Sequence, residues 1–207
     1  MNRFDKIAPE FDTDKRKKRA LAVATELRRH ITADNKSAIE FGCGTGLLGL
    51  ELCDCFKKLI FVDSSAGMIE QVNIKLAQLN NPALSAVCCD LMQEIPEGLD
   101  ADCVFCSLVL HHIVDTGKVL QAFFNLLNTH GRLLIVDLNP DDGGFHAGDL
   151  RFIGHHGYEQ KQLLRDGANA GFASCTVHTF YNDTKSVNGV EKPYSLFVLI
   201  ADKGTSD

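Results

Sequence analysis

The chain has 207 residues, of which 45% are hydrophobic and 23% charged, and its formal net charge is −6. This composition is typical of a single globular domain and excludes a disordered chain. The acidic balance argues against a general nucleic-acid binder, and no apolar run approaches the roughly 20 residues of a membrane-spanning helix. The first residues have no signal-peptide core, so we expect a cytoplasmic protein with one domain over 1–207.

Short apolar runs alternate with amphipathic patterns along the chain. A helix is expected first, over Thr13–Thr32, and five basic residues from Lys15 to Arg19 lie near its start. The runs that predict strands are Ala38–Phe41, Leu59–Val62, Ser85–Cys88, Cys103–Leu108, Arg132–Val136, Ser174–Phe180 and Leu196–Ile200. Helical spacing recurs between them, over Ile69–Leu79, Leu120–Leu127 and Glu159–Ala170.

This alternation predicts an α/β fold, with a mostly parallel sheet and helices on both faces. The last two strands are separated only by a polar stretch that contains Asn182, Asp183, Asn188, Gly189 and Pro193. We therefore expect these two strands to form an antiparallel hairpin at the edge of the sheet, joined by a polar loop.

The eight cysteines lie mostly in apolar runs and are expected to be buried thiols. Cys103 and Cys106 form a CxxC pair inside an expected strand, where residues three apart point to opposite faces, so these two thiols are not expected to share a zinc ion. The basic run from Lys15 to Arg19 is interpreted as a solvated helix face, with a wall of the substrate site or a nucleic-acid patch as alternatives.

The most informative stretch is Glu40-Phe41-Gly42-Cys43-Gly44-Thr45-Gly46, where the first strand meets the following helix. Glycines at alternate positions let a ligand lie against backbone amides at a helix N-terminus. Asp63 ends the second strand about 20 residues later, where a carboxylate can bind both hydroxyls of a ribose. Asp90 and Leu91 follow the third strand and suit the amine and ring face of adenine.

Two classes of cofactor fit a glycine loop that is followed by a carboxylate able to bind a ribose. Gly44 to Gly49 also satisfies GxGxxG, the dinucleotide pattern. Glu40, however, is a poor neighbour for a pyrophosphate and a good one for a cation, and the terminal hairpin departs from a dinucleotide fold. A nucleotide with positive charge and no phosphate fits better, which points to S-adenosylmethionine.

The chain resembles the class I S-adenosylmethionine-dependent methyltransferases, and within them the small-molecule branch of the ubiquinone and menaquinone biosynthesis enzymes. EFGCGTG resembles motif I of that family, and the likeness continues through the segments 61–68, 89–91, 107–113 and 130–138. It implies a Rossmann-like seven-stranded sheet of order 3-2-1-4-5-7-6, with strand 7 antiparallel and an N-terminal helical cap.

The resemblance also implies residue roles around S-adenosylmethionine and its product S-adenosylhomocysteine. Gly42, Cys43, Gly44 and Gly46 would lie at the methionyl part, with Glu40 near its ammonium group. Asp63 and Ser64 would lie at the ribose, Met68 would flank the adenine, and Asp90 with Leu91 would hold it. Ser107 would approach the methyl donor.

Histidines follow two strands at the edge where the methyl group would point. His111 and His112 come after the fourth strand, and His155 and His156 follow the fifth in a glycine-rich stretch. We expect them on the acceptor side as contacts or as a base, with ordinary packing as the alternative. His146, Asp149, His155 and His156 match no compact zinc motif, so no metal is predicted.

The sequence thus predicts methyl transfer from S-adenosylmethionine to a small-molecule acceptor by in-line displacement, without nucleic-acid or membrane partners. The alternatives are an NAD(P)-linked oxidoreductase, a non-catalytic S-adenosylmethionine-binding protein, and an RNA or protein methyltransferase. Residues 1–35 and the loop 141–158 are unclaimed by the sheet. We expect them to form a two-part lid, with Phe4 or Phe11 against the acceptor and the basic run in solvent.

Overall fold

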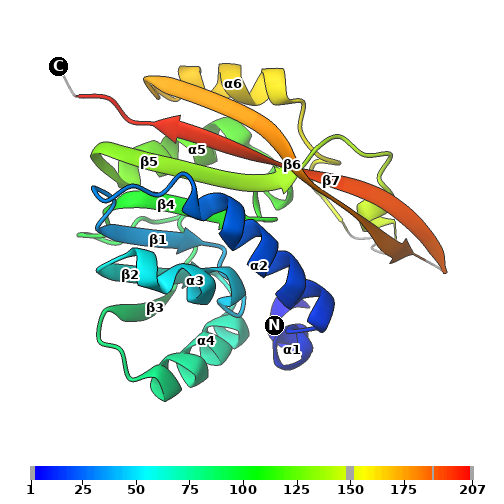
Figure 1. Ribbon diagram of the computed structural model, residues 1–207, viewed down its shortest axis with the longest axis horizontal. Coiled ribbons are helices and arrows are strands. Elements are labelled where there is room, and N and C mark those ends of the chain that lie inside the picture. The colour runs from blue at the N-terminus through cyan, green and yellow to red at the C-terminus, as the bar shows by residue number, and fades with distance from the viewer. Residues whose placement is uncertain (1–2, 148–151, 188, 206–207) are drawn as a thin grey trace.

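The computed structural model describes residues 3–147, 152–187 and 189–205. Their strands form one seven-stranded sheet (Figure 1). Its order is β3-β2-β1-β4-β5-β7-β6, with β7 antiparallel to β5 and β6 and the remaining pairs parallel. The predicted fold class and strand order are therefore confirmed. The strands are β1 (Ser37–Phe41), β2 (Lys58–Asp63), β3 (Leu84–Cys88), β4 (Ala101–Ser107), β5 (Leu127–Leu138), β6 (Ser174–Val187) and β7 (Val190–Asp202).

Helices cover both faces of this sheet (Figure 1). They are α1 (Arg3–Ile7), α2 (Asp14–Arg28), α3 (Leu47–Leu52), α4 (Ala66–Leu79), α5 (Thr116–Leu126) and α6 (Gln160–Asn169), with 3-10 turns η1 (Ala8–Glu10), η2 (Cys53–Cys55), η3 (Leu110–His112) and η4 (Gly144–His146). Side-chain caps explain where three of them begin: Thr13, Ser65 and Asp115 accept hydrogen bonds from backbone amides in the first turns of α2, α4 and α5. The short α1 was not expected.

The core consists of two apolar clusters, one on each face of the sheet. One joins Val104 and Cys106 of β4 to buried residues of α5 and α6, and the other joins Cys103 and Phe105 to buried residues of α2, α3 and α4. Cys103 and Cys106 thus point to opposite faces, as the strand period predicts. All eight cysteines are free, and the expectation that they are buried is confirmed for Cys43, Cys103 and Cys106. It was wrong for Cys88, which is exposed at the end of the sheet's edge strand β3, and the other four are only partly buried.

The expected polar loop between the last two strands is wrong. β6 and β7 pair from Ser174↔Asp202 to Val187↔Val190, so Asn182, Asp183 and Pro193 lie inside a long two-stranded ribbon. Proline is tolerated because this part of β7 has no second neighbour, as β5 pairs with β7 only as far as Leu196. Asn188 lies outside the described residues. The ribbon positions Lys185 and Tyr194 beside the carboxyl ends of the central strands.

Across the described ranges, no helix has both the length and the apolar content needed to cross a membrane.

Candidate functional site

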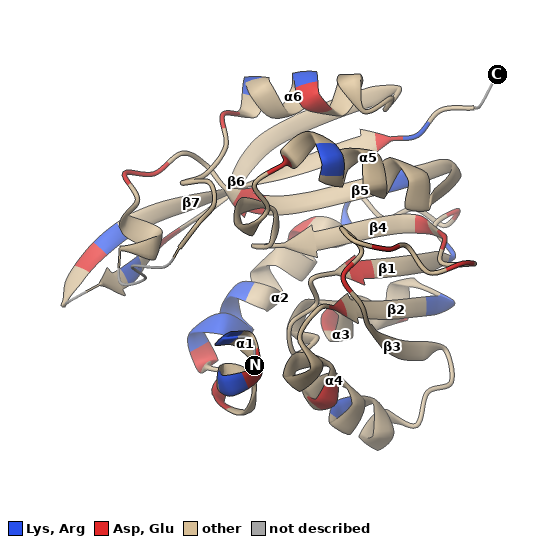
Figure 2. Ribbon diagram, turned by 180° about the vertical axis from the view of Figure 1, so that it is seen from behind, with Lys and Arg blue, Asp and Glu red and all other residues tan. Residues whose placement is uncertain are grey.

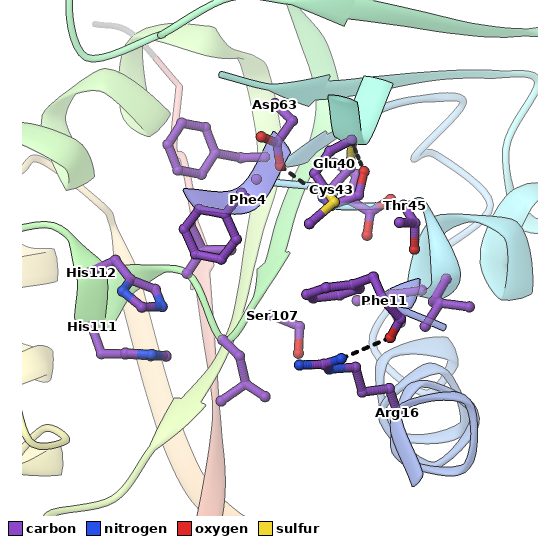
Figure 3. Close-up of a pocket in the computed structure, with 18 of the residues that line it drawn as sticks. Phe4, Phe11, Arg16, Glu40, Cys43, Thr45, Asp63, Ser107, His111 and His112 are labelled. Atoms are coloured by element: carbon purple, nitrogen blue, oxygen red, sulfur yellow. Dashed lines mark hydrogen bonds between the residues drawn. The ribbon is translucent and has the colours of Figure 1, made fainter. Parts of the chain in front are cut away.

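A cavity of about 620 Å³ lies at the carboxyl ends of the central strands. Its wall comes from the glycine loop, the segments after β2, β3, β4 and β5, the N-terminal helices, and the β6–β7 ribbon. Figure 3 shows Asp63, Glu40 and Cys43 on one side, Arg16 and Ser107 on another, and His111 with His112 on a third. This is the edge at which open parallel sheets bind ligands.

The glycine loop has a backbone that side chains rarely adopt. Gly42, Gly44 and Gly46 have φ of +62°, +53° and +77°. A Cβ at Gly42 would lie 2.6 Å from Val109, whereas at Gly44 the nearest atom would be 3.6 Å away, on Phe11. Gly42 and Gly44 line the cavity but Gly46 does not, because its open side faces Phe61 and Val72 of the core. Gly46 therefore allows close packing beneath the loop.

Carboxylates gather beside the glycine loop, on one side of the cavity. Glu40 is only 3% exposed and accepts a hydrogen bond from the Gly49 amide at 3.1 Å. Asp63 accepts from the amides of Gly44 and Ser65, both at 2.8 Å. Burial raises the pKa of both carboxyls, and the pKa of Glu40 is raised further by the negative charge of Asp63. Bringing a cation into contact would relieve this cost, which favours a ligand carrying positive charge.

The other residues predicted for the cofactor are also on the cavity wall: Cys43, Ser64, Met68, Asp90, Leu91 and Ser107. Met68 is 1% exposed, so it contributes to the core as well as to the wall. Asp90 accepts hydrogen bonds from the Met92 amide and the Gln93 side chain, at 3.0 and 2.8 Å. Their contacts with the cofactor stay predictions.

Three histidines meet at the third side of the cavity. His111 is 1% exposed, and its Nδ1 lies 2.6 Å from Oδ1 of the fully buried Asp137. His112 and His146 also line the cavity. Packing around their rings and repulsion from His111 lower the pKa of His112 to about 4 and that of His146 to about 3. Both imidazoles are therefore neutral at physiological pH.

His155 and His156 are not in this wall. Nε2 of His155 lies 3.0 Å from the Val114 carbonyl oxygen, and the His155 amide donates to the His111 carbonyl at 2.8 Å. His155 and His156 belong instead to the segment that packs behind η3, so the histidines on the cavity wall are His111, His112 and His146. Asp149 lies outside the described residues.

Five basic side chains line the part of the cavity formed by α1, α2 and β6. Arg3, Lys15, Arg16 and Arg19 come from α1 and α2, where Figure 2 shows basic residues clustering, and Lys185 comes from β6. Burial lowers the pKa of Lys185, and the positive charges of Arg19, Arg16 and Arg3 lower it further. These cations therefore face a common space. The interpretation of the basic run as a solvated face was wrong for Arg16 and Arg19, which are partly buried in the cavity wall, whereas Lys17 and Lys18 are exposed and outside the wall. Lys15 is exposed and also borders the cavity.

Comparison with known proteins agrees with this geometry. A family described as a methyltransferase domain matches residues 13–184. The chain belongs to this family. The expectation of a class I S-adenosylmethionine-dependent methyltransferase is confirmed, while the narrower likeness to the ubiquinone branch is not specifically shown. Family membership also removes the grounds for the oxidoreductase alternative.

The methyltransferase domain has relatives among curated proteins and solved structures. It is 27% identical to an uncharacterized methyltransferase of Schizosaccharomyces pombe over 82% of this chain and 64% of that protein. It is 31% identical to a malonyl-[acyl-carrier protein] O-methyltransferase of Legionella pneumophila, over 50% of this chain and 36% of that one. The chain thus spans less than two thirds of the length of these relatives. Haemonchus contortus phosphoethanolamine N-methyltransferase 2, solved with S-adenosyl-L-methionine, has the same fold (TM-score 0.68, 14% identity, 83% of this chain and 49% of that chain).

The N-terminal segment of this methyltransferase is attached to the cofactor side by two aspartates. Asp5 accepts hydrogen bonds from the Ser65 hydroxyl at 2.6 Å and the Gly67 amide at 3.2 Å. Asp12 pairs with Lys75 at 2.6 Å and accepts from the Thr45 hydroxyl. Phe4 and Phe11 consequently lie in the cavity wall (Figure 3). The lid role of this segment stays a prediction.

Sequence reasoning missed several wall residues of the methyltransferase, notably Arg3, Thr45, Phe145, Lys185 and Tyr194. It also missed Asp137 behind His111. Asp137 had a readable signal, since it ends an apolar strand as Asp63 does, and Thr45 lies within the glycine motif itself. The others reach the cavity through the β6–β7 ribbon, the loop after β5 and the N-terminal helices.

Proposed function

We propose that this methyltransferase transfers the methyl group of S-adenosylmethionine to a small molecule that carries an anionic group. The observation that supports it is the division of one cavity into an acidic side, with Glu40, Asp63 and Asp90, and a basic side on α1, α2 and β6. The acidic side suits a cofactor with ammonium and sulfonium charges, and the basic side suits a carboxylate or phosphate.

The transfer itself is an in-line displacement. The acceptor's lone pair forms a bond to the methyl carbon as the carbon–sulfur bond breaks, leaving S-adenosylhomocysteine, and a protonated acceptor also loses its proton. The donor is already activated, so the protein mainly has to orient the two reactants and exclude water. Phe4 and Phe11 supply apolar surface for the second task.

Within the basic side, Arg16 is the cation best placed for an anion. Its Nη1 donates to the Phe11 carbonyl oxygen at 2.9 Å, and its guanidinium lies 4.0 Å over the Phe11 ring. These contacts hold the group in a fixed orientation while its other N–H donors stay available for an anion. The acid substrates in the names of the Legionella and Haemonchus relatives, a malonyl group and phosphoethanolamine, are consistent with this acceptor class.

The experiment compares Arg16→Gln with Lys18→Gln, a control from the same helix that lies outside the cavity wall. Turnover is screened on small carboxylic and phosphate-bearing metabolites and on their neutral esters. We expect Arg16→Gln to raise KM for the acidic acceptor about tenfold or more, as the loss of a charge-assisted hydrogen bond implies, with S-adenosylhomocysteine affinity within about twofold. A preferred acceptor without charge, or an unchanged KM in Arg16→Gln, contradicts the anionic class.

A further inference from the structure

Three imidazoles that follow two neighbouring strands, those of His111, His112 and His146, lie together on the cavity wall. His111 and His112 lie on η3 after β4, and His146 lies on η4 after the neighbouring β5. Their ring centroids are 4.2, 4.9 and 5.4 Å apart in pairs. One nitrogen of each ring lies within 4.8 Å of the other two.

Two of these nitrogens lack the partners that buried polar atoms normally have. Nε2 of His111 and Nε2 of His146 are shielded from solvent, and neither has a hydrogen-bond partner among the described residues. Burying such an atom unpaired is unfavourable unless a ligand completes the site. His111 is only 1% exposed and lines the cavity. Its unpaired Nε2 therefore belongs to the cavity wall.

Asp137 determines which nitrogen of His111 is free. Its carboxylate accepts from the Leu138 amide at 2.7 Å and from the His111 amide at 3.2 Å, and it lies 2.6 Å from Nδ1 of His111. A carboxylate accepts hydrogen bonds, so Nδ1–H of His111 donates to Asp137 and Nε2 is the nitrogen left to face a ligand. A carboxylate behind a histidine in this way is the usual support of a metal-bound imidazole.

A second histidine group in the same chain shows what a satisfied cluster looks like. Glu26, His30 and His178 also bring three ligand atoms together. There, however, Nε2 of His30 and Nε2 of His178 both lie within hydrogen-bonding distance of Glu26 Oε1, at 3.2 and 2.9 Å. These three side chains therefore complete one another and need no ion.

We propose that His111, His112 and His146 bind a divalent transition-metal ion, with Zn²⁺ as the best fit, and that Asp137 is the positioning residue for His111. Three imidazoles without a thiolate suit zinc or a neighbouring first-row metal. Tetrahedral zinc at about 2.0–2.1 Å from nitrogen separates its ligands by roughly 3.4 Å. Rotations of the His112 and His146 rings that move their nitrogens by about an ångström would bring the three ligand atoms to this separation.

The surroundings favour a site with an open position. Phe152 stacks on His146 with ring centroids 3.8 Å apart, and Phe4 meets the His112 ring edge-on at 5.8 Å. All three histidines line the cavity, so the remaining coordination position faces the acceptor. Resting on the proposed function, we assign that position to a hydroxyl oxygen of the acceptor. The bound ion would make this hydroxyl more acidic, and its proton would pass to water. A lone pair of the oxygen that the metal does not use would then form the bond to the methyl carbon, as the carbon–sulfur bond breaks and S-adenosylhomocysteine leaves.

The test measures metal binding directly, on protein purified without a histidine tag and treated with chelator. Titration with Zn²⁺ by calorimetry and with Co²⁺ by visible absorption should give one equivalent and the intense ligand-field bands of a four-coordinate ion. His146→Ala, a change on a loop, should abolish the bands, and Asp137→Asn should weaken affinity roughly 10- to 100-fold. His178→Gln, from the satisfied cluster, should leave the stoichiometry unchanged.

S-adenosylhomocysteine affinity is measured on the same samples, so that two failures can be told apart. Protein that binds S-adenosylhomocysteine but neither metal overturns the metal site alone, and so does His146→Ala protein with wild-type bands. Loss of the bands in His178→Gln overturns the assignment of the ligands. Protein that binds metal but no S-adenosylhomocysteine leaves the metal site standing and contradicts the proposed function.

Discussion

Gly44→Ala separates the conformational role of the glycine loop from its role in binding. Gly44 has φ +53°, so a side chain there incurs the cost of a left-handed backbone, about 1–2 kcal/mol. The new methyl group meets no protein atom closer than 3.6 Å, so the fold loses little else. For a chain of this size the loss corresponds to a fall in Tm of about 2–8 °C.

Binding should suffer more than stability, because the added methyl group points into the cavity. Filling a contact surface with one extra carbon typically costs about 1–3 kcal/mol, or roughly a 5- to 150-fold loss of affinity. The assay is calorimetric titration with S-adenosylhomocysteine beside a thermal melt. Gly98→Ala is the matched control, since Gly98 has φ +75°, has no atom within 4 Å of a Cβ, and lies outside the cavity wall.

We expect Gly98→Ala to show a similar fall in Tm with wild-type affinity. Wild-type affinity in Gly44→Ala would refute the placement of the cofactor on this loop. Equal losses of affinity in the two variants would show that binding follows global stability instead.

Three further predictions test other parts of the site. Asp63→Ala should lower S-adenosylhomocysteine affinity at least about tenfold in calorimetry, since charge-assisted hydrogen bonds to the ribose are worth about 1.5–3 kcal/mol each; unchanged affinity would remove Asp63 from the ribose site. Burial raises the pKa of Glu40, so the folded state holds a proton that the unfolded state releases, and unfolding free energy should fall as pH rises above about 4.3. Glu40→Gln should flatten that fall in urea titrations from pH 5 to 8, and an identical slope in both proteins would contradict it. Deleting residues 1–13, which removes Phe4, Phe11 and the Asp12–Lys75 ion pair, should leave cofactor affinity within about threefold while turnover drops strongly; normal turnover would exclude the lid.

The acidic wall of the cavity was predictable because its residues are local to strand ends. Glu40, Asp63 and Asp90 each lie at or just beyond an apolar run, and parallel strands bring those ends to one edge. The position of Gly46 beneath the loop, outside the cavity wall, could not be predicted in this way. Its place in the glycine pattern is the same as that of Gly44, and only the packing of Phe61 against it shows that it supports the loop from below.

The acceptor side depends on contacts between distant segments. Lys185 reaches the cavity because β6 continues far past the sheet in register with β7, and polar residues along that ribbon resemble a loop in sequence. His146 joins His111 across 35 positions through a turn held by Asp141, whose carboxylate accepts from the amides of Gly143 and Phe145 at 2.7 and 2.8 Å. Hydrophobic periodicity carries no information on such pairings.

The most direct test of methyl transfer to an anionic small molecule follows the methyl group itself. Protein is incubated with S-adenosylmethionine carrying a deuterated methyl group and with a small-molecule extract that is separated by anion exchange and read by mass spectrometry. We expect a deuteromethylated product among the anionic compounds, formed together with S-adenosylhomocysteine and formed more slowly by Gly44→Ala at a low concentration of S-adenosylmethionine. Cofactor binding without a labelled product in any fraction, or label confined to compounds that the anion exchanger does not retain, would contradict methyl transfer to an anionic small molecule.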